Sequence, residues 1–159
     1  MIKTENLTKI FRTEEVETVA LNGVSINVED GEFVAIMGPS GCGKSTLLGI
    51  LSGSLKADGG NILVDGKEPF KNSRVFSRYI GFVPQENPLM ENLSVYDNLK
   101  FWYCDTGRSL KQDLVNGVPA VLGVSQYLHK TVDKLSGGMK KRLSICCALA
   151  KNPPVLILD

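Results

Sequence analysis

The sequence lacks several features that would point to particular classes of protein. Its 159 residues carry 18 basic and 17 acidic side chains, a formal net charge of +1, so no excess of positive charge predicts a surface for nucleic acid or anionic lipid. No apolar run approaches the roughly 20 residues that a membrane-spanning helix needs, and the first six residues contain no apolar region typical of a signal peptide. We therefore expect one cytoplasmic domain of ordinary size.

The cysteines and the single histidine are not spaced as in sequences that bind metals or form disulfides. The four cysteines, Cys42, Cys104, Cys146 and Cys147, show no C-x-x-C spacing, and His129 is the only histidine. The adjacent pair at 146 and 147 lies in a helical apolar pattern, which favours packing in the core. His129 is interpreted as a surface residue. Metal-cluster and disulfide roles are therefore disfavoured.

Three glycines, by contrast, lie close together in one short motif, residues 38–46. Residues 38–46 read Gly-Pro-Ser-Gly-Cys-Gly-Lys-Ser-Thr and fit the phosphate-binding pattern G-x-x-x-x-G-K-[S/T] at every fixed position. An apolar run, residues 33–37, precedes the motif, and a helix-like run, residues 44–51, follows it. This strand, loop and helix order favours a phosphate site over the alternative, a glycine-rich turn before an ordinary helix.

The chemistry of triphosphates explains the residues of this motif. Backbone N–H groups at a helix N-terminus are fixed donors for phosphate oxygens, and glycines let those oxygens approach closely. Lys44 adds a positive charge for the β- and γ-phosphates, and the Ser45 hydroxyl is suited to bind Mg²⁺. The predicted phosphate-binding residues are Gly38, Ser40, Gly41, Cys42, Gly43, Lys44, Ser45 and Thr46.

Hydrophobic periodicity predicts an α/β fold with an antiparallel start and a helical middle. We expect strands over residues 2–7, 16–21, 24–28, 33–37, 61–64, 79–83 and 155–158, with an Asp-Gly turn making a hairpin of the third and fourth. We expect helices over residues 44–51, 94–103, 109–117, 125–130 and 139–150. Residues 86–134 therefore form a helical insertion in an α/β core.

Two further positions carry polar groups at the ends of these elements. Gln85 follows a predicted strand and Pro84, at the kind of strand end where ligands bind in α/β sheets. Ser136 is placed as the N-cap of the helix expected from about Met139, after the small residues Gly137 and Gly138. The basic run Lys140-Lys141-Arg142 on that helix suggests nucleic acid, but a solvated helix face is the favoured interpretation.

The last predicted strand ends in Asp159. A carboxylate at the end of a buried strand is a suitable partner for hydrated Mg²⁺ beside a phosphate loop.

Together these motifs resemble the ATP-binding subunit of ATP-binding-cassette (ABC) transporters, along the whole chain and in the family's order. Residues 38–46 match the Walker A loop, Gln85 the Q-loop, residues 135–139 the signature sequence, and residues 155–159 the Walker B strand. The resemblance implies an α/β P-loop NTPase core with an N-terminal antiparallel subdomain. It places the ATP-binding core at residues 1–85 and 148–159 and the helical subdomain at residues 86–147.

The resemblance also implies a function and roles for individual residues. Mg-ATP would be bound and hydrolysed to drive a transporter. Residues 19–46 and 80–101 resemble those of exporter-associated cassettes, so the transporter is expected to be an exporter. Lys44, Gln85 and Asp159 would act in catalysis, and Ser45, Gln85 and Asp159 would bind Mg²⁺. Phe11 lies where the family places an aromatic residue that stacks on adenine.

Partners are implied in the same way. An integral-membrane permease would hold the subunit at the cytoplasmic face of the membrane, and a second copy or a paralogue would complete a head-to-tail dimer. In that dimer Ser136, Gly137 and Gly138 of one copy close over ATP held by the other. No nucleic-acid partner is expected.

The chain departs from the family's pattern at two places. Met139 stands where the signature commonly has glutamine, and the chain ends at Asp159, before the family's catalytic glutamate. A chain of this length is therefore expected to bind ATP but to hydrolyse it negligibly. The alternatives are a soluble family member acting in nucleic-acid repair or translation, and a nucleotide-binding module without turnover. A P-loop kinase or GTPase would not explain residues 135–138.

Overall fold

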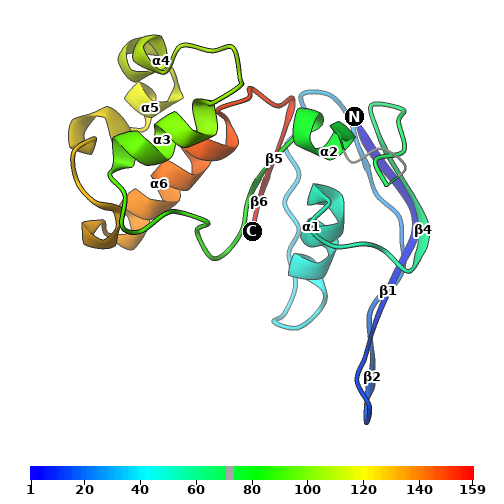
Figure 1. Ribbon diagram of the computed structural model, residues 1–159. Helices are drawn as coiled ribbons and strands as arrows, with labels where there is room; N and C mark the ends of the chain where they lie inside the picture. Colours follow the sequence, from blue (N-terminus) through cyan, green and yellow to red (C-terminus); the bar gives the residue numbers. More distant parts are fainter. Residues whose placement is uncertain (71–73) are drawn as a thin grey trace. The chain divides into compact units, whose positions relative to one another are not determined.

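Figure 1 shows the computed structural model, which describes residues 1–70 and 74–159. The chain forms two compact units, Met1–Ile80 and Gly81–Asp159. Each unit has its own secondary structure and its own buried residues.

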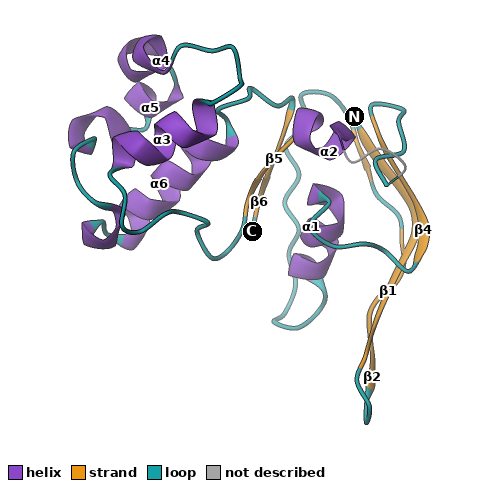
Figure 2. Ribbon diagram, viewed as in Figure 1, coloured by secondary structure: helices purple, strands orange, loops and turns teal. Residues whose placement is uncertain are grey.

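The first unit is built around one long strand. β1 (Ile2–Arg12) pairs antiparallel with β2 (Glu17–Val24), β3 (Asn27–Val28) and β4 (Gly59–Val64). The strands of this sheet run side by side in Figure 2. β4 follows β1 only as far as Thr8, and beyond that residue β1 and β2 continue as a two-stranded arm. The expected antiparallel start is confirmed; β1, β2 and β4 are longer than predicted, and β3 is shorter.

The helices of this unit supply the rest of its core. α1 (Lys44–Ser52) buries Leu47, Ile50 and Leu51, which lie three and four residues apart and so share one face. α2 (Arg74–Tyr79) is a short helix that periodicity did not predict. The buried apolar residues of the sheet are Ile2, Leu7, Leu21, Ile62 and Val64.

The predicted strand at residues 33–37 is wrong. The Glu29–Glu32 turn is present, with a Glu32 N–H to Glu29 O hydrogen bond of 3.3 Å, but no strand of the described residues pairs with the segment that follows. Phe33 is 94% exposed and Met37 87% exposed. An apolar run becomes a strand only when a neighbour takes its backbone N–H and C=O groups, and the predicted hairpin fails for that reason.

The second unit is mainly helical (Figure 2). α3 (Val95–Tyr103) packs against α6 (Gly137–Ala148). α4 (Leu110–Asn116), α5 (Val118–Val121), η1 (Val124–Tyr127) and η2 (Val132–Lys134) connect them. A third helix predicted at residues 125–130 is instead the 3₁₀ turn η1. The core of the unit comprises Val95, Leu99, Tyr103, Val124, Val132, Leu135, Leu143, Cys146, Cys147 and Ala150.

Two short strands complete the chain. β5 (Ile80–Val83) pairs with β6 (Val155–Leu158). The Asp159 N–H donates to the Val83 carbonyl over 2.9 Å, so the residues that follow the two strands lie together. The predicted elements at 79–83 and 155–158 are confirmed to within one residue. No helix of the described residues is long and apolar enough to cross a membrane.

Candidate nucleotide-binding site

The glycine-rich loop of the first unit leads directly into α1. Gly43 is the N-cap residue and has φ +89°, and no side chain caps the N-terminus of this helix. α3, α4 and α6, by contrast, are each preceded by an N-cap serine whose hydroxyl accepts a hydrogen bond from a backbone N–H of the first turn. The N-terminal turn of α1 also contains no acidic residue. Its positive end therefore suits an anionic ligand rather than a side-chain cap.

Glycine is required at two positions of this loop. Gly41 and Gly43 have φ of +79° and +89°, where L side chains are strained. A Cβ on Gly43 would also lie 2.4 Å from the Ala20 carbonyl oxygen of β2. A Cβ on Gly38 would meet the Cys42 sulfur at 2.7 Å. Gly43 is therefore required by both backbone conformation and space, whereas Gly41 is required by its φ alone, because a Cβ there would meet nothing within 4 Å. We call this glycine-rich loop, residues 38–46, the cradle.

Lys44 is folded back over this loop. Its Nζ donates to the carbonyls of Gly38, at 2.9 Å, and Pro39, at 2.7 Å, and lies 3.6 Å from the Cys42 sulfur. The positive charge is thus held by neutral carbonyl groups at the mouth of the cradle. A phosphate oxygen would be a stronger partner for the ammonium than either carbonyl, because charge-assisted hydrogen bonds are about twice as strong as neutral ones.

Phe11 lies in the same unit, on the arm formed by β1 and β2. It pairs with Thr18 across the arm, and its side chain is 44% exposed. β2 pairs with the part of β1 that carries Phe11, and β2 also carries Ala20, whose carbonyl faces Gly43. β2 therefore links the aromatic residue to the loop. The ring is available for stacking, which an aromatic residue buried in the core would not be.

In the second unit, Gln85 and Asp159 follow the two paired strands β5 and β6. Gln85 follows Pro84 and is exposed. Lys141 of α6 donates to the Pro84 carbonyl, at 3.0 Å, and to the Asp159 carbonyl, at 2.8 Å. The Lys141 ammonium group therefore links the residue after β5 to the residue after β6.

The interpretation of the basic run on α6 as a solvated face is wrong for Lys141. Lys140 forms an ion pair of 2.8 Å with Glu91, and Lys141 is half-buried against the two strand ends. Of the three, only Arg142 is exposed. Charge alone could not distinguish the three, because the partners of Lys141 are backbone carbonyls with no sequence signature.

A buried amide shapes the segment that follows Gln85. Asn98 of α3 is fully buried; its Nδ2 donates to the carbonyls of Met90 and Ser94, and its Oδ1 accepts the Met90 N–H. Ser144 of α6 donates to Asn87 Oδ1 over 2.9 Å. Every polar atom of Asn98 has a hydrogen-bond partner, as expected for a buried amide. Asn98 therefore ties this segment to α3, and Ser144 ties it to α6.

The predicted N-cap at Ser136 is confirmed. Its hydroxyl accepts the Met139 N–H at 3.3 Å, and α6 begins at Gly137. Ideal Cβ atoms on Gly137 and Gly138 would meet nothing within 4 Å, so both glycines face open space. Their predicted role, contact with a nucleotide held by another copy, needs such an open surface.

The donor sets of both units fit Mg-ATP. In the first unit the cradle and the uncapped helix suit phosphate oxygens, and Ser45 offers a hydroxyl oxygen. In the second unit, taken by itself, Gln85 and Asp159 offer amide and carboxylate oxygens, which are among the ligands that Mg²⁺ prefers. Among the described residues no three His, Cys, Asp or Glu side chains gather as a metal cluster. Mg²⁺ held by few protein oxygens, with phosphate and water completing its shell, does not need such a cluster.

Fold and loop together define a P-loop nucleotide-binding protein with a separate helical unit. Comparison with known families gives the assignment: the family model described as ABC transporter matches residues 21–159. The chain therefore belongs to the ABC transporter family.

Two curated relatives illustrate the similarity. The sulfate/thiosulfate import ATP-binding protein CysA 1 of Chromobacterium violaceum is 38% identical over 164 residues, covering 99% of this chain and 44% of its own length. The spermidine/putrescine import ATP-binding protein PotA of Bacteroides fragilis is 38% identical over 162 residues, covering 100% of this chain and 34% of its own length. The chain thus spans less than half the length of these relatives. Their names specify import and give no support to the expected exporter.

A solved structure shows the same fold. The dimeric ATP-binding cassette MJ0796, in a post-hydrolysis state with ADP and Pi, superposes with a TM-score of 0.86 at 32% identity, covering 100% of this chain and 73% of the other. The P-loop fold class expected from the sequence is confirmed.

Proposed function

We propose that this chain binds Mg-ATP as the energy-coupling subunit of an import-type ABC transporter. The observation that carries the proposal is the glycine cradle at an uncapped helix N-terminus, with the Lys44 ammonium at its mouth. Lys44 would bind the β- and γ-phosphates, and Ser45, Gln85 and Asp159 would hold Mg²⁺, which neutralises charge on the phosphates when bound. Gln85 would also orient the attacking water.

ATP would join two subunits head to tail. The related cassette MJ0796 is dimeric, which supports a dimer, and the open Gly137 and Gly138 surface of this chain supports the head-to-tail arrangement. Closure on ATP and reopening after hydrolysis would move a membrane permease between two states. The subunit would act at the cytoplasmic face of the membrane, and the permease would select the cargo.

Direct binding measurements test the nucleotide part of this proposal. Titration calorimetry should show Mg-ATP binding that falls at least tenfold in Lys44→Ala, since hydrogen bonds to charged groups contribute about 1.5–3 kcal/mol. Lys56→Ala, which removes an exposed lysine outside the loop, is the matched control and should bind as the wild type does. Equal affinities for all three proteins would contradict the proposal.

Purification from membranes tests the transport part. The tagged protein should copurify with a polytopic membrane protein, and disruption of its gene should abolish uptake of one solute. Association with ribosomes or nucleic acid in place of a membrane protein would instead support a soluble role.

A further inference from the structure

The arm that carries Phe11 has little support of its own. Beyond Thr8, β1 no longer pairs with β4, and the register between β1 and β2 is irregular between Lys9 and Ile10. An isolated two-stranded hairpin is only marginally stable in water. The position of the Phe11 ring therefore depends on whatever fixes the base of the arm.

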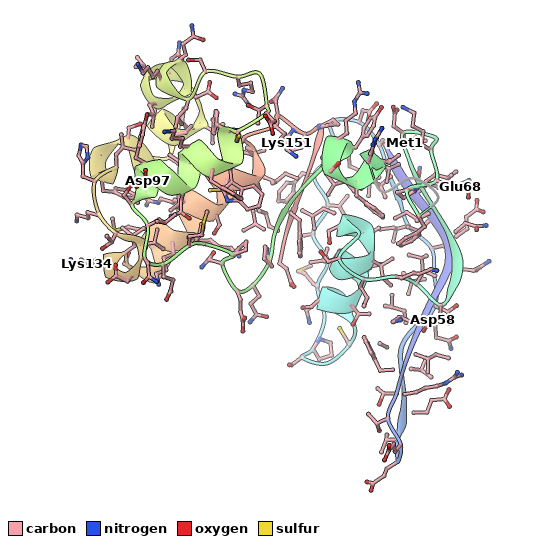
Figure 3. The ribbon with its side chains drawn as sticks, in the orientation of Figure 1. Met1, Asp58, Glu68, Asp97, Lys134 and Lys151 are labelled. Atoms are coloured by element: carbon pink, nitrogen blue, oxygen red, sulfur yellow. The ribbon has the colours of Figure 1, made fainter. Side chains whose placement is uncertain are left out.

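Asp58 fixes that base through three consecutive residues of β1. Its carboxylate accepts the Ile10 N–H at 2.8 Å and the Lys9 ammonium at 2.9 Å, and its own N–H donates to the Thr8 carbonyl at 2.9 Å. Figure 3 shows Asp58 beside β1, just before β4 begins. The Ile10 N–H is thus used by a side chain at the irregular step of the ladder, where a bulge leaves backbone groups without a strand partner.

The same carboxylate acts on the Phe11 ring through Lys9. The Lys9 side chain is only 14% exposed, and its Nζ lies 5.5 Å from the centroid of the Phe11 ring, within the range of a cation–π contact. Asp58 holds this ammonium and also the backbone immediately before Phe11. The Ile10 N–H and then Lys9 hold the pKa of the Asp58 carboxyl below its usual range, so both oxygens are acceptors at neutral pH.

We propose that Asp58 is a positioning residue for nucleobase stacking: it fixes the arm so that the Phe11 ring meets the base of a nucleotide whose phosphates lie in the 38–46 loop. The inference rests on the proposed function. Asp58 itself would touch neither base nor phosphate. Since a phenyl ring has no hydrogen-bonding groups, the contact would add affinity for any base and select for none.

Comparing two ligands isolates this role. Mg-ATP and inorganic tripolyphosphate share the phosphate chain, and only ATP has a base. Asp58→Ala should weaken Mg-ATP binding roughly tenfold, within the range for loss of one base-stacking contact, and should leave tripolyphosphate binding unchanged. Phe11→Ala should show the same split. The double variant should lose no more than Phe11→Ala alone, because the two residues act as one unit.

Conservative variants separate positioning from general stability. Asp58→Asn keeps one oxygen for the Ile10 N–H and should recover part of the ATP affinity. Asp65→Ala removes an exposed acid at the end of β4, 4.0 Å from Lys67, and should bind both ligands as the wild type does. If Asp58→Ala does not fold, as judged by circular dichroism, the Asp58→Asn and Phe11→Ala comparison carries the test.

Three results would overturn the inference. Equal losses for both ligands would mean that Asp58 supports the whole unit or the loop; unchanged ATP affinity would mean that it does not position the ring; additive losses with Phe11→Ala would mean that the two residues act separately. A wild-type protein that binds neither ligand would overturn the proposed function, and this inference with it.

Discussion

At the scale of single residues, the four cysteines occupy two kinds of environment. Cys42 and Cys104 are exposed, whereas Cys146 and Cys147 are buried in α6. Burial raises the pKa of the Cys146 thiol to about 12, and burial followed by the charge of Cys146 raises that of Cys147. The reactive thiolate form is therefore suppressed at both buried positions.

We predict that an alkylating reagent at neutral pH modifies Cys42 and Cys104 in the folded protein, and all four cysteines only in denaturant. Because Cys42 lies within the proposed phosphate cradle, Mg-ATP should slow its modification at least severalfold and leave Cys104 unaffected. Peptide mass spectrometry at timed intervals measures both rates. Equal rates at Cys42 with and without Mg-ATP would contradict its placement in the site.

Substitutions at two glycines separate the cost of backbone strain from the cost of a steric clash. Gly60 has φ +85°, and a Cβ there would lie 2.3 Å from the Asn6 carbonyl oxygen. Gly66 has φ +70° and open space around it. Gly66→Ala should cost about 1 kcal/mol from φ alone, and Gly60→Ala about 3 kcal/mol or more, since backbone atoms of β1 must also move. Urea unfolding measures both, and equal losses would show that the close contact with Asn6 is unimportant.

At the scale of elements, Arg108 joins three helices of the second unit. Its guanidinium donates to the Leu149 and Ala150 carbonyls beyond the end of α6 and pairs with Asp113 of α4 at 2.7 Å. Asp113 also accepts the Tyr103 hydroxyl of α3 at 2.6 Å. The Asp113 side chain is 15% exposed, so the pair is partly shielded from water.

We predict that Arg108→Ala lowers the free energy of unfolding of this unit by about 2 kcal/mol, less than for a fully buried pair because Arg108 is partly exposed. Arg108→Lys should recover little, since an ammonium lacks the fork that spans a carboxylate and two carbonyls. Arg142→Ala, which removes an exposed arginine of α6, is the control. Thermal unfolding compares the three, and a full recovery by Arg108→Lys would contradict the geometric argument.

The same network gives an alkaline limit to stability. Burial, followed by the hydrogen bond to Asp113, raises the pKa of Tyr103 above its ordinary value of 10.0. A pKa raised by folding contributes stability that is complete below the unfolded pKa and is lost as pH rises above it. Stability measured from pH 8 upwards should therefore begin to fall near pH 10, and Tyr103→Phe should reduce this fall. An unchanged alkaline profile in Tyr103→Phe would assign the effect to other groups.

The elements show what local sequence can predict and what it cannot. Helix starts at Ser94, Ser109 and Ser136 were predictable because a cap and its helix are adjacent in the chain. The failure at residues 33–37 has the opposite cause, since a strand is completed by a neighbour that local periodicity does not reveal. The same holds at the site: the loop at 38–46 is local and was predicted, whereas the contacts of Asp58 and Lys141 join distant residues and were not.

At the scale of the whole molecule, the proposed nucleotide contacts are divided between the two units. The loop and Phe11 belong to Met1–Ile80, and Gln85, Asp159 and the start of α6 belong to Gly81–Asp159. In the proposed dimer, the Gly137 region would complete a site on the other copy. Each nucleotide would then depend on the loop of one chain and on α6 of its partner.

Mixing two defective chains tests this arrangement. Lys44→Ala damages the loop, and Gly137→Asp places a negative charge against phosphate at a position where a side chain meets no neighbour; Gly137→Ala is its control. Neither variant alone should form nucleotide-bound dimers. Mixed in equal amounts, they should form heterodimers with one intact site, retaining about half the wild-type nucleotide per dimer, as measured by size-exclusion chromatography and nucleotide analysis. If loop and α6 instead served the same chain's nucleotide, every site in the mixture would carry a defect and none would be retained.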